Sequence, residues 1–410
     1  MEDWIRNMTP GVSLLFNIGI TVLVIIVLST LSTLLTNTLY TPAAPKGWGS
    51  MDYDALQGTR DSLINYMASV GLSVDTTPIN QFSVGTANFG GIYTESSGLV
   101  NPWIGSVSGD AARLQVEAGA RAMVLDIWPD PADRQTPIVC AMLDTQAPGR
   151  AIQKFWHATG LNKGVGRYSN WQRLTRNKTP VGEILKPALT AAFMGSPGPQ
   201  NTDPFFLIMK LHGPMTTDYL NRLGSIVQDA IGGNAMGAEW NKCINQKSIC
   251  TAPVSQFLSK VFVIVIPDIQ PSYNSLPGIN TYAAFTAAFL TTTMGEITNA
   301  LEQNPNTISF EPSGITAISN ASQPACGSGS SAVAAPPQSL AQVGFCLVQP
   351  TIGGDTTDNA EFYSQNSYTA CLQSGAQFVA VNLFSQNTGD AVLNTFFDSD
   401  HFGKYSFRKI

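Results

Sequence analysis

The sequence predicts an α/β protein, a (β/α)8 TIM-like barrel preceded by a single N-terminal transmembrane helix. From Gln81 onward, apolar strand-like runs alternate with amphipathic helical stretches, and about eight of them fit the chain. Some runs are wholly apolar, as Val261–Ile266 is, which is typical of parallel strands that are buried on both faces. The same alternation also permits an open, doubly wound sheet.

The expected strands are short apolar runs, bounded in most cases by turn residues. They are Phe82–Val84, Ala122–Ile127, Pro137–Met142, Phe205–Leu211, Val261–Ile266, Thr307–Phe310, Phe345–Val348 and Phe378–Phe384. Helical spacing predicts helices at Asp52–Val70, Ala111–Ala118, Ala151–Ala158 and Thr217–Ile231. Ser108 offers a capping side chain to the second of these. We expect residues 143–200 to contribute loops near the barrel mouth, and the Gly/Ser/Ala/Pro-rich stretch 320–343 to be a long inserted surface loop.

The N-terminal region contains the strongest membrane signal. No charged residue occurs between Arg6 and Lys46, and Val12–Leu35 is almost wholly apolar. A run of about 20 apolar residues crosses a bilayer as a helix. A cleaved signal peptide, which needs a basic start and a shorter apolar core, and a buried helix are the alternatives. The predicted organisation is a tail (1–10), an anchor (11–38), a tether with a helical lead-in (39–75) and the barrel (76–410).

Composition limits the possible partners. The chain is 44% hydrophobic, enough for a large core, and only 12% charged, about half the usual share. A net charge of -6 with no basic face gives no nucleic-acid partner. A sparsely charged surface favours a protein packed among other proteins of an assembly, although a secreted glycoprotein has a similar composition. Sequons occur at Asn7, Asn177 and Asn320, a frequency near chance.

The six cysteines allow two disulfides in an oxidising compartment. Cys243 and Cys250 flank a short polar loop, and Cys326 and Cys346 flank the low-complexity stretch. The two remaining cysteines, Cys140 and Cys371, lie in expected core segments and are interpreted as buried thiols. No Cys/His group has zinc-ligand spacing, so we expect no structural metal.

Several segments share motifs with a known family. Val124-Leu-Asp-Ile-Trp-Pro-Asp130 is similar to a strand ending E-L-D-x-W-D-G, and Gly375-Ala-Gln-Phe-Val-Ala-Val-Asn382 to a closing block G-C-Q-M-V-A-L-N. With these, the chain resembles the catalytic barrel of phosphoinositide-specific phospholipase C. The matching segments, in order, are Arg121–Met142, Pro204–His212, Ser255–Ile266 and Gly375–Ile410.

The resemblance implies that the catalytic histidines of the family are lost. The two positions correspond to Ala87 and Ala141, and alanine cannot accept or donate a proton. The chain has only three histidines, His157, His212 and His401, and we expect none of them to be catalytic.

The resemblance also implies a degenerate calcium site. Asn88 and Asp126 match two ligand positions, Val124 replaces a carboxylate, and Lys210 falls where another carboxylate should be. An ammonium there would repel calcium and form a salt bridge with Asp126. We therefore expect a vestigial pocket of Asn88, Asp126 and Lys210, without metal or cofactor. The family's phosphate-binding lysines fall on uncharged residues, Val265 and Pro267, or Ile264 and Ile266 after a one-residue slip.

These features predict a membrane-anchored, non-catalytic phospholipase C-like barrel, a pseudoenzyme with a structural or interaction role. Its partners would be the lipid bilayer, through residues 11–38, and other proteins of an assembly. The composition and the anchor are similar to those of structural proteins of large DNA viruses with an internal membrane. They suggest a minor capsid or membrane-linking virion component. A cell-surface or endomembrane protein is the alternative.

Two other functions remain open. A hydrolase of another class could use polar residues at strand ends, namely Asp126, Lys210, Asp268 and Glu311, for acid–base chemistry. The barrel mouth could also bind a lipid headgroup or a sugar without any chemistry.

Overall fold

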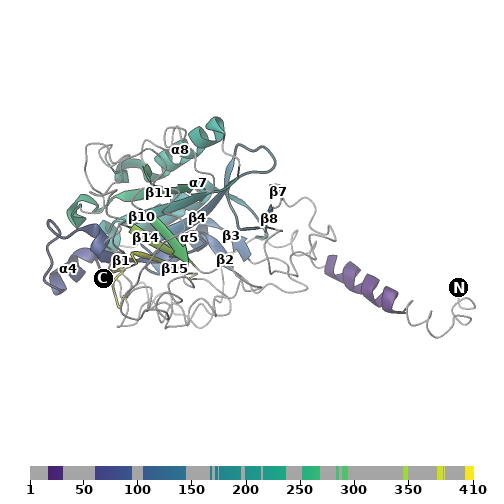
Figure 1. Cartoon of the computed structure of the whole chain (residues 1–410), viewed down its shortest axis with the longest axis horizontal. Helices are drawn as coiled ribbons and strands as arrows, with labels where there is room; N and C mark the ends of the chain where they lie inside the picture. Colours follow the sequence, from purple (N-terminus) through teal and green to yellow (C-terminus); the bar gives the residue numbers. More distant parts are fainter. Residues whose placement is uncertain are drawn as a thin grey trace, which may run out of the picture.

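The structure is a computed structural model, and its description covers a defined part of the chain. The described residues are 17–30, 61–94, 105–144, 167–168, 171–173, 175–194, 199–213, 216–236, 252–267, 283–285, 289–293, 345–349, 376–381, 383 and 402–410. Within them, a helix over residues 17–30 lies apart from a body of strands and helices (Figure 1).

Eight parallel strands follow one another in sequence order around a ring. The last strand pairs with the first, with Val84 opposite Phe378, so the sheet curls back on itself. Among the described residues, every neighbour contact of such a ring is present except the one between β12 and β13. This is the strand order of a (β/α)8 barrel, and an open doubly wound sheet does not pair its first strand with its last. The eight strands are β1 (Phe82–Ala87), β4 (Ala122–Pro129), β10 (Phe205–Leu211), β11 (Val261–Pro267), β12 (Ala283–Phe285), β13 (Phe289–Thr293), β14 (Phe345–Gln349) and β15 (Phe378–Val381).

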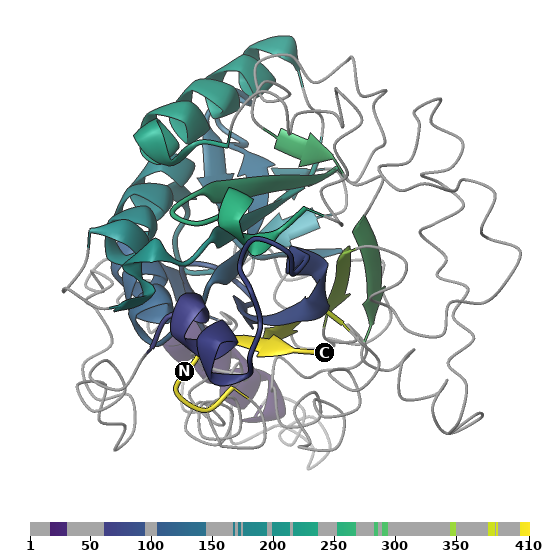
Figure 2. The same cartoon turned by 90° about the vertical axis from the view of Figure 1, so that its left-hand side faces the viewer.

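Three helices cover the outside of β4, β10 and β11 (Figures 1 and 2). Ser108 caps the first of them by accepting a hydrogen bond from the backbone N–H of Ala111, as expected. The second contains Pro187, which cannot donate to the carbonyl of Glu183. Gly109 packs against that carbonyl so closely that a Cβ there would lie 2.4 Å from the oxygen. The helices are α5 (Gly109–Glu117), α7 (Val181–Phe193) and α8 (Thr217–Ile231).

Alternate residues of each strand face opposite sides of the barrel wall. An outer cluster packs Met123, Leu125 and Met209 against α5, α7 and α8. An inner cluster contains Val124 and Ile208 from the same strands. Even-numbered residues of β4 and β10 therefore face the barrel interior, and odd-numbered residues face the helices.

Two terminal elements close the barrel at the end where its strands begin. The inner cluster includes Leu63 and Met67 of α4 (Leu63–Ser69) and Phe407 of β16 (Phe407–Lys409). β16 pairs antiparallel with the start of β1, and Figure 2 looks onto this end, which we call the base. The remaining described elements are β2 (Ile92–Thr94), β3 (Gly105–Val107), β5 (Pro137–Val139), β6 (Met142–Asp144), β7 (Arg167–Tyr168), β8 (Trp171–Arg173), β9 (Thr179–Pro180), η1 (Ile79–Gln81), η2 (Pro199–Thr202), η3 (Gly232–Asn234) and η6 (Val254–Gln256).

The structure corrects three expectations. The run Pro137–Met142 is not a barrel strand, because β5 turns back from β4 as an antiparallel hairpin. Residues 143–200 contain helix α7, which two prolines concealed. The two strands β12 and β13 were not expected. The expected helix Ala151–Ala158, the strand Thr307–Phe310 and the loop 320–343 lie outside the described residues.

The N-terminal helix covers only part of the expected anchor, and the rest of 11–38 lies outside the described residues. In the described part of the chain, no helix combines the length and apolarity needed to cross a membrane. Most of the large apolar side chains of this helix are exposed, by 44% at Ile20 and by up to 60% at Leu23 and Leu28.

Candidate functional site at the barrel mouth

Asp126 and Lys210 lie opposite each other near the carboxyl ends of two adjacent strands. Asp126 of β4 is the register partner of Lys210 of β10, and both positions belong to the inner face. In parallel barrels the carboxyl ends of the strands form the mouth, where ligands bind. The two residues expected to form a vestigial pocket are therefore brought together at this mouth.

A third side chain completes the cluster. Nζ of Lys210 lies 3.5 Å from Oδ1 of Asp126, and Nε2 of His212 lies 2.7 Å from the same oxygen. The ring of His212 stacks on Trp128, with centroids 4.4 Å apart and planes 13° from parallel. Its backbone N–H donates to the carbonyl of Ile127 at 2.9 Å, which fixes the turn after β10. We call Asp126, Lys210 and His212 the mouth cluster.

The electrostatics of the mouth cluster favour a charged carboxylate. Burial raises the pKa of Asp126, but the charge of Lys210 and the hydrogen bond from His212 outweigh it and lower the pKa to about 2. With Asp126 ionised, Nε2 of His212 carries the proton that it shares with the carboxylate. Asp126 is therefore an acceptor at neutral pH and not a general acid.

The residues at the mouth do not fit a calcium ion. The ammonium of Lys210 lies where a cation would need to approach Asp126, and Val124, the other replaced ligand, is fully buried in the inner cluster. Among the described residues, no three His, Cys, Asp or Glu side chains form a group able to hold a metal.

The two alanines that the family resemblance matches to catalytic histidines face the helix layer and not the barrel interior. Ala87 is the register partner of Met123, an outer-cluster residue, so it shares the face that contacts the helices. Ala141 belongs to the outer cluster itself. A histidine at either position would point into the helix layer. The strand alternation of β1, continued by one residue, puts Asn88 on the inner face instead, where it is buried.

The positions that the family resemblance matches to phosphate-binding lysines carry no charge. Val265 belongs to the outer cluster, whereas Ile264 packs in the inner cluster. Ile266 and Pro267 complete β11. Any positive charge that β10, the residue after it and β11 bring to the mouth therefore comes from Lys210 and His212.

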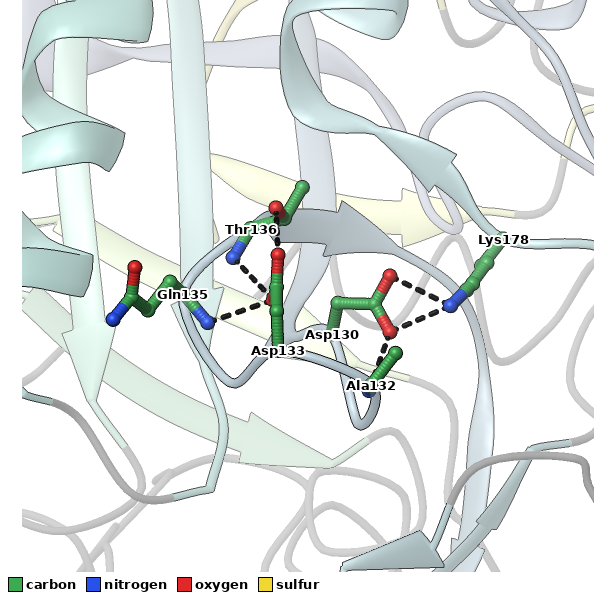
Figure 3. A network of polar contacts seen from close by, with 6 residues as sticks. All are labelled: Asp130, Ala132, Asp133, Gln135, Thr136 and Lys178. Atoms are coloured by element: carbon green, nitrogen blue, oxygen red, sulfur yellow. Dashed lines mark hydrogen bonds and ion pairs between the residues drawn. The ribbon is translucent and has the colours of Figure 1, made fainter.

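The loop between β4 and β5 holds its own carboxylates at the rim (Figure 3). Both oxygens of Asp130 accept from Nζ of Lys178, at 2.5 and 2.6 Å. Asp133 accepts from the hydroxyl of Thr136 at 2.6 Å and from two backbone N–H groups. The bond from Thr136 contributes most to lowering the pKa of Asp133 to about 2. Both carboxylates therefore already have hydrogen-bond partners within the chain, and these bonds stabilise the loop.

Other sequence-predicted positions have separate outcomes. The sequon residue Asn177 donates to the carbonyl of Val107 at 2.7 Å and accepts from its N–H at 2.8 Å, so its amide links the segment before β9 to β3. Cys140 is buried, as expected, and Cys346 lies in β14. The remaining predicted positions lie outside the described residues: Cys243, Cys250, Cys326, Cys371, His157, His401, Asp268 and Glu311.

His212 is the site residue that the sequence did not identify. Its contact with Asp126 joins residues 86 positions apart and depends on the register between β4 and β10. The available signal was its spacing: two residues after Lys210, it falls on the same face of the extended chain.

Comparison with known proteins gives similarity in structure only. No family model matches the chain, and no curated protein matches it significantly. The solved structures it resembles include PLC21 of S. officinalis (TM-score 0.47, 10% identity, 80% of this chain and 36% of that chain). They also include the phosphatidylinositol-specific phospholipase C of Listeria monocytogenes (0.41, 8%, 78% and 95%) and a glycerophosphodiester phosphodiesterase from Parabacteroides distasonis (0.32, 13%, 76% and 98%). The chain spans about a third of the length of the two PLC21 structures it matches. The barrel assignment for this chain follows from its own strand order and pairing.

Proposed function

We propose that the chain is a non-catalytic phospholipase C-like barrel with a structural or interaction role, tethered to a membrane through residues 11–38. The observation that carries the proposal is the state of Asp126, the carboxylate that a catalytic metal would need. One of its oxygens is shared by Lys210 at 3.5 Å and His212 at 2.7 Å. A carboxylate neutralised by its own chain is a poor calcium ligand.

The membrane tether is supported by the N-terminal helix. Most of its large apolar side chains are exposed, and in water such a surface promotes aggregation. Two of its hydroxyls are satisfied inside the helix, since Thr21 donates to the carbonyl of Asn17 at 2.8 Å and Thr30 to that of Ile26 at 2.7 Å. Internal satisfaction of polar groups is what a lipid environment requires. A virion membrane is one setting for such a tether, and only the composition favours it.

A turnover assay tests the absence of catalysis. The full-length chain in detergent would be mixed with phosphatidylinositol micelles, and separately with a glycerophosphodiester, each with and without calcium. We expect no phosphate-containing product above that of a His212→Ala variant. Binding of phosphatidylinositol without turnover would favour the headgroup-binding alternative.

A second candidate is a hydrolase of another class, favoured by the bond between His212 and Asp126. A carboxylate that orients an imidazole is an arrangement used in general acid–base catalysis. Metal-independent turnover that disappears in His212→Ala would support this candidate and contradict the first.

The tether has its own experiment. After expression in cells, the full-length chain should remain with the membranes during alkaline extraction. Leu23→Arg, in the apolar run, should reduce that retention, whereas Val70→Arg, at the exposed apolar residue directly after α4, should not. Equal retention of both variants would contradict the tether.

A further inference from the structure

Helix α4 is seated on the barrel base by contacts to distant parts of the chain. Its side chains Leu63 and Met67 are fully buried among inner-cluster residues, where they fill the end of the barrel. The backbone N–H of Leu63 donates to Oδ1 of Asp203, just before β10, at 2.8 Å. We call α4 (residues 63–69) the plug.

The C-terminal segment holds the plug from its other side. Nζ of Lys404 lies 2.9 Å from Oδ2 of Asp61, and the ring of Tyr66 packs on Tyr405 with centroids 5.0 Å apart. The hydroxyl of Tyr66 accepts from the backbone N–H of Lys409 at 2.9 Å. The ion pair is exposed on the lysine side, so this half of the attachment is open to solvent, unlike the half at Asp203.

Asp203 is completely buried and incompletely paired. Its Oδ2 has no hydrogen-bond partner among the described residues, although Oδ1 accepts from Leu63. The nearby Arg121 is also buried, and its guanidinium donates to the carbonyl of Ala192 at 3.0 Å. Arg121 attracts the carboxylate, but no hydrogen bond joins the two side chains in the described contacts. A dry carboxylate with one hydrogen bond is costly to ionise.

We propose that the protonation state of Asp203 controls the seating of the plug, so that α4 is a pH-responsive closure of the barrel base. Protonated Asp203 can remain dry beneath α4. Once it has lost its proton, the carboxylate gains hydration if the plug lifts, because the plug itself supplies its single hydrogen bond and covers it.

The charges around Asp203 set the pH at which this happens. Burial raises the pKa of Asp203 to about 7, against the opposing effects of Arg121 and of the Leu63 N–H, and Asp61 at the start of the plug raises it further. Lys404 is paired with Asp61, and the ammonium of Lys260, before β11, contacts the carbonyl of Gly233 instead. The seated state therefore binds the proton more tightly than a hydrated state. Seating weakens as pH rises from about 4 to about 7 and then stays constant.

Hydrogen exchange of the full-length chain in detergent tests the proposal. Protection factors, corrected for the intrinsic rate at each pH, would be measured between pH 5 and 8 for residues 63–69 and for β10. We expect protection of the plug to fall roughly tenfold per pH unit up to about pH 7 and then to level off. The plug should also be less protected than β10 at every pH. A flat profile would show that no proton controls the plug, and equal protection of the two segments throughout would show that the plug does not open separately; either result would overturn the proposal.

Two matched variants localise the effect. Asp203→Asn keeps an oxygen acceptor for Leu63 but cannot ionise, so the pH dependence of the plug should disappear. Asp75→Asn removes an exposed carboxylate just beyond the plug and should leave the dependence unchanged. If Asp203→Asn kept the wild-type profile, the proposal would be wrong. The wild-type series decides the question even if that variant does not fold.

Discussion

The mouth and the base of the barrel each contain an aspartate near a cation, on or just before the paired strands β4 and β10, yet the pKa values of the two carboxyls are shifted in opposite directions. At the mouth, the pKa of Asp126 is lowered to about 2. At the base, the pKa of Asp203 is raised to about 7. In both cases burial is the largest influence and acts in the same direction, so burial alone does not distinguish them.

The difference lies in how the cationic partners make contact. Asp126 has Lys210 and His212 within contact distance of one oxygen, and its side chain keeps 14% of its exposure. Asp203 has no exposure and has Arg121 as an attractive charge without a hydrogen bond. Direct contacts keep the mouth carboxylate charged at neutral pH, whereas an attractive charge without a hydrogen bond leaves the base carboxyl able to titrate near neutrality. Near neutral pH the charge of the mouth carboxylate is therefore constant, whereas the charge of the base carboxyl changes with pH.

The largest expected effect is the pH dependence of global stability. The folded-state pKa of Asp203 is raised, so its stabilising contribution is complete below about pH 4 and is lost as pH rises to about 7. The loss is on the order of 4 kcal/mol. Urea unfolding at pH 4.5 and 7.5 measures it. Asp203→Asn should match the wild type at the lower pH and exceed it at the higher. If the unfolding free energies of the wild type and of Asp203→Asn depended equally on pH, Asp203 would not titrate near neutrality, and the mouth and the base would not differ as we describe.

The next largest effect concerns the mouth cluster, whose contribution to the unfolding free energy is lost as pH falls and not as it rises. Asp126→Ala leaves Lys210 and His212 partly buried without their anion, and we expect a loss of about 2–3 kcal/mol in unfolding free energy at pH 7. In the wild type this contribution is present above about pH 4 and falls away toward pH 2, because the pKa of Asp126 is lowered. The control is Asp110→Ala, at a carboxylate 57% exposed, which should cost under about 0.5 kcal/mol. Similar losses in the two variants would mean that the mouth cluster does not contribute to the stability of the fold.

Sequence patterns predicted the elements whose burial or amphipathic spacing was unambiguous. The strand Phe205–Leu211 and the helix Thr217–Ile231 have the bounds expected from the sequence. Helix α7 was missed because Pro187 within it and Pro180 before it read as breaks, although the outer cluster and the close approach at Gly109 stabilise it. Tertiary packing overrode a local propensity that the sequence alone could not discount.

The site was predictable only as far as strand register can be inferred. Asp126 and Lys210 were expected together because the family resemblance matches both to positions of one metal site, and they are register partners. Ala87 shows the limit, since a shift of one residue exchanges the inner and outer faces of a strand and motif similarity did not fix that face. His212 was undervalued for a related reason: its partner is defined by pairing between β4 and β10 and not by any local motif.

A smaller effect should appear when the mouth is given a second carboxylate. In Lys210→Glu, two carboxylates at register-paired positions face the mouth, an arrangement that favours calcium. If the resulting site has a dissociation constant of about 1 mM, 10 mM calcium should raise the unfolding free energy of the variant by roughly 1.4 kcal/mol. Calcium should leave the wild type unchanged. Lys210→Gln, which removes the ammonium without adding a ligand, separates ligand gain from relief of repulsion. Calcium stabilisation of the wild type itself would contradict our view that Lys210 excludes the metal.

The smallest expected effect separates the two attachments of the plug. Lys404 is 55% exposed and pairs with Asp61 in solvent, so Lys404→Met should shift the urea midpoint only slightly, and the shift should vanish in 1 M salt. The effect of Asp203→Asn should persist in the same salt, because ions do not screen a fully buried carboxyl. If Lys404→Met changed the pH profile of the plug as strongly as Asp203→Asn does, the surface pair would control the base. The contrast between a fixed mouth and a base governed by a buried proton would then not hold.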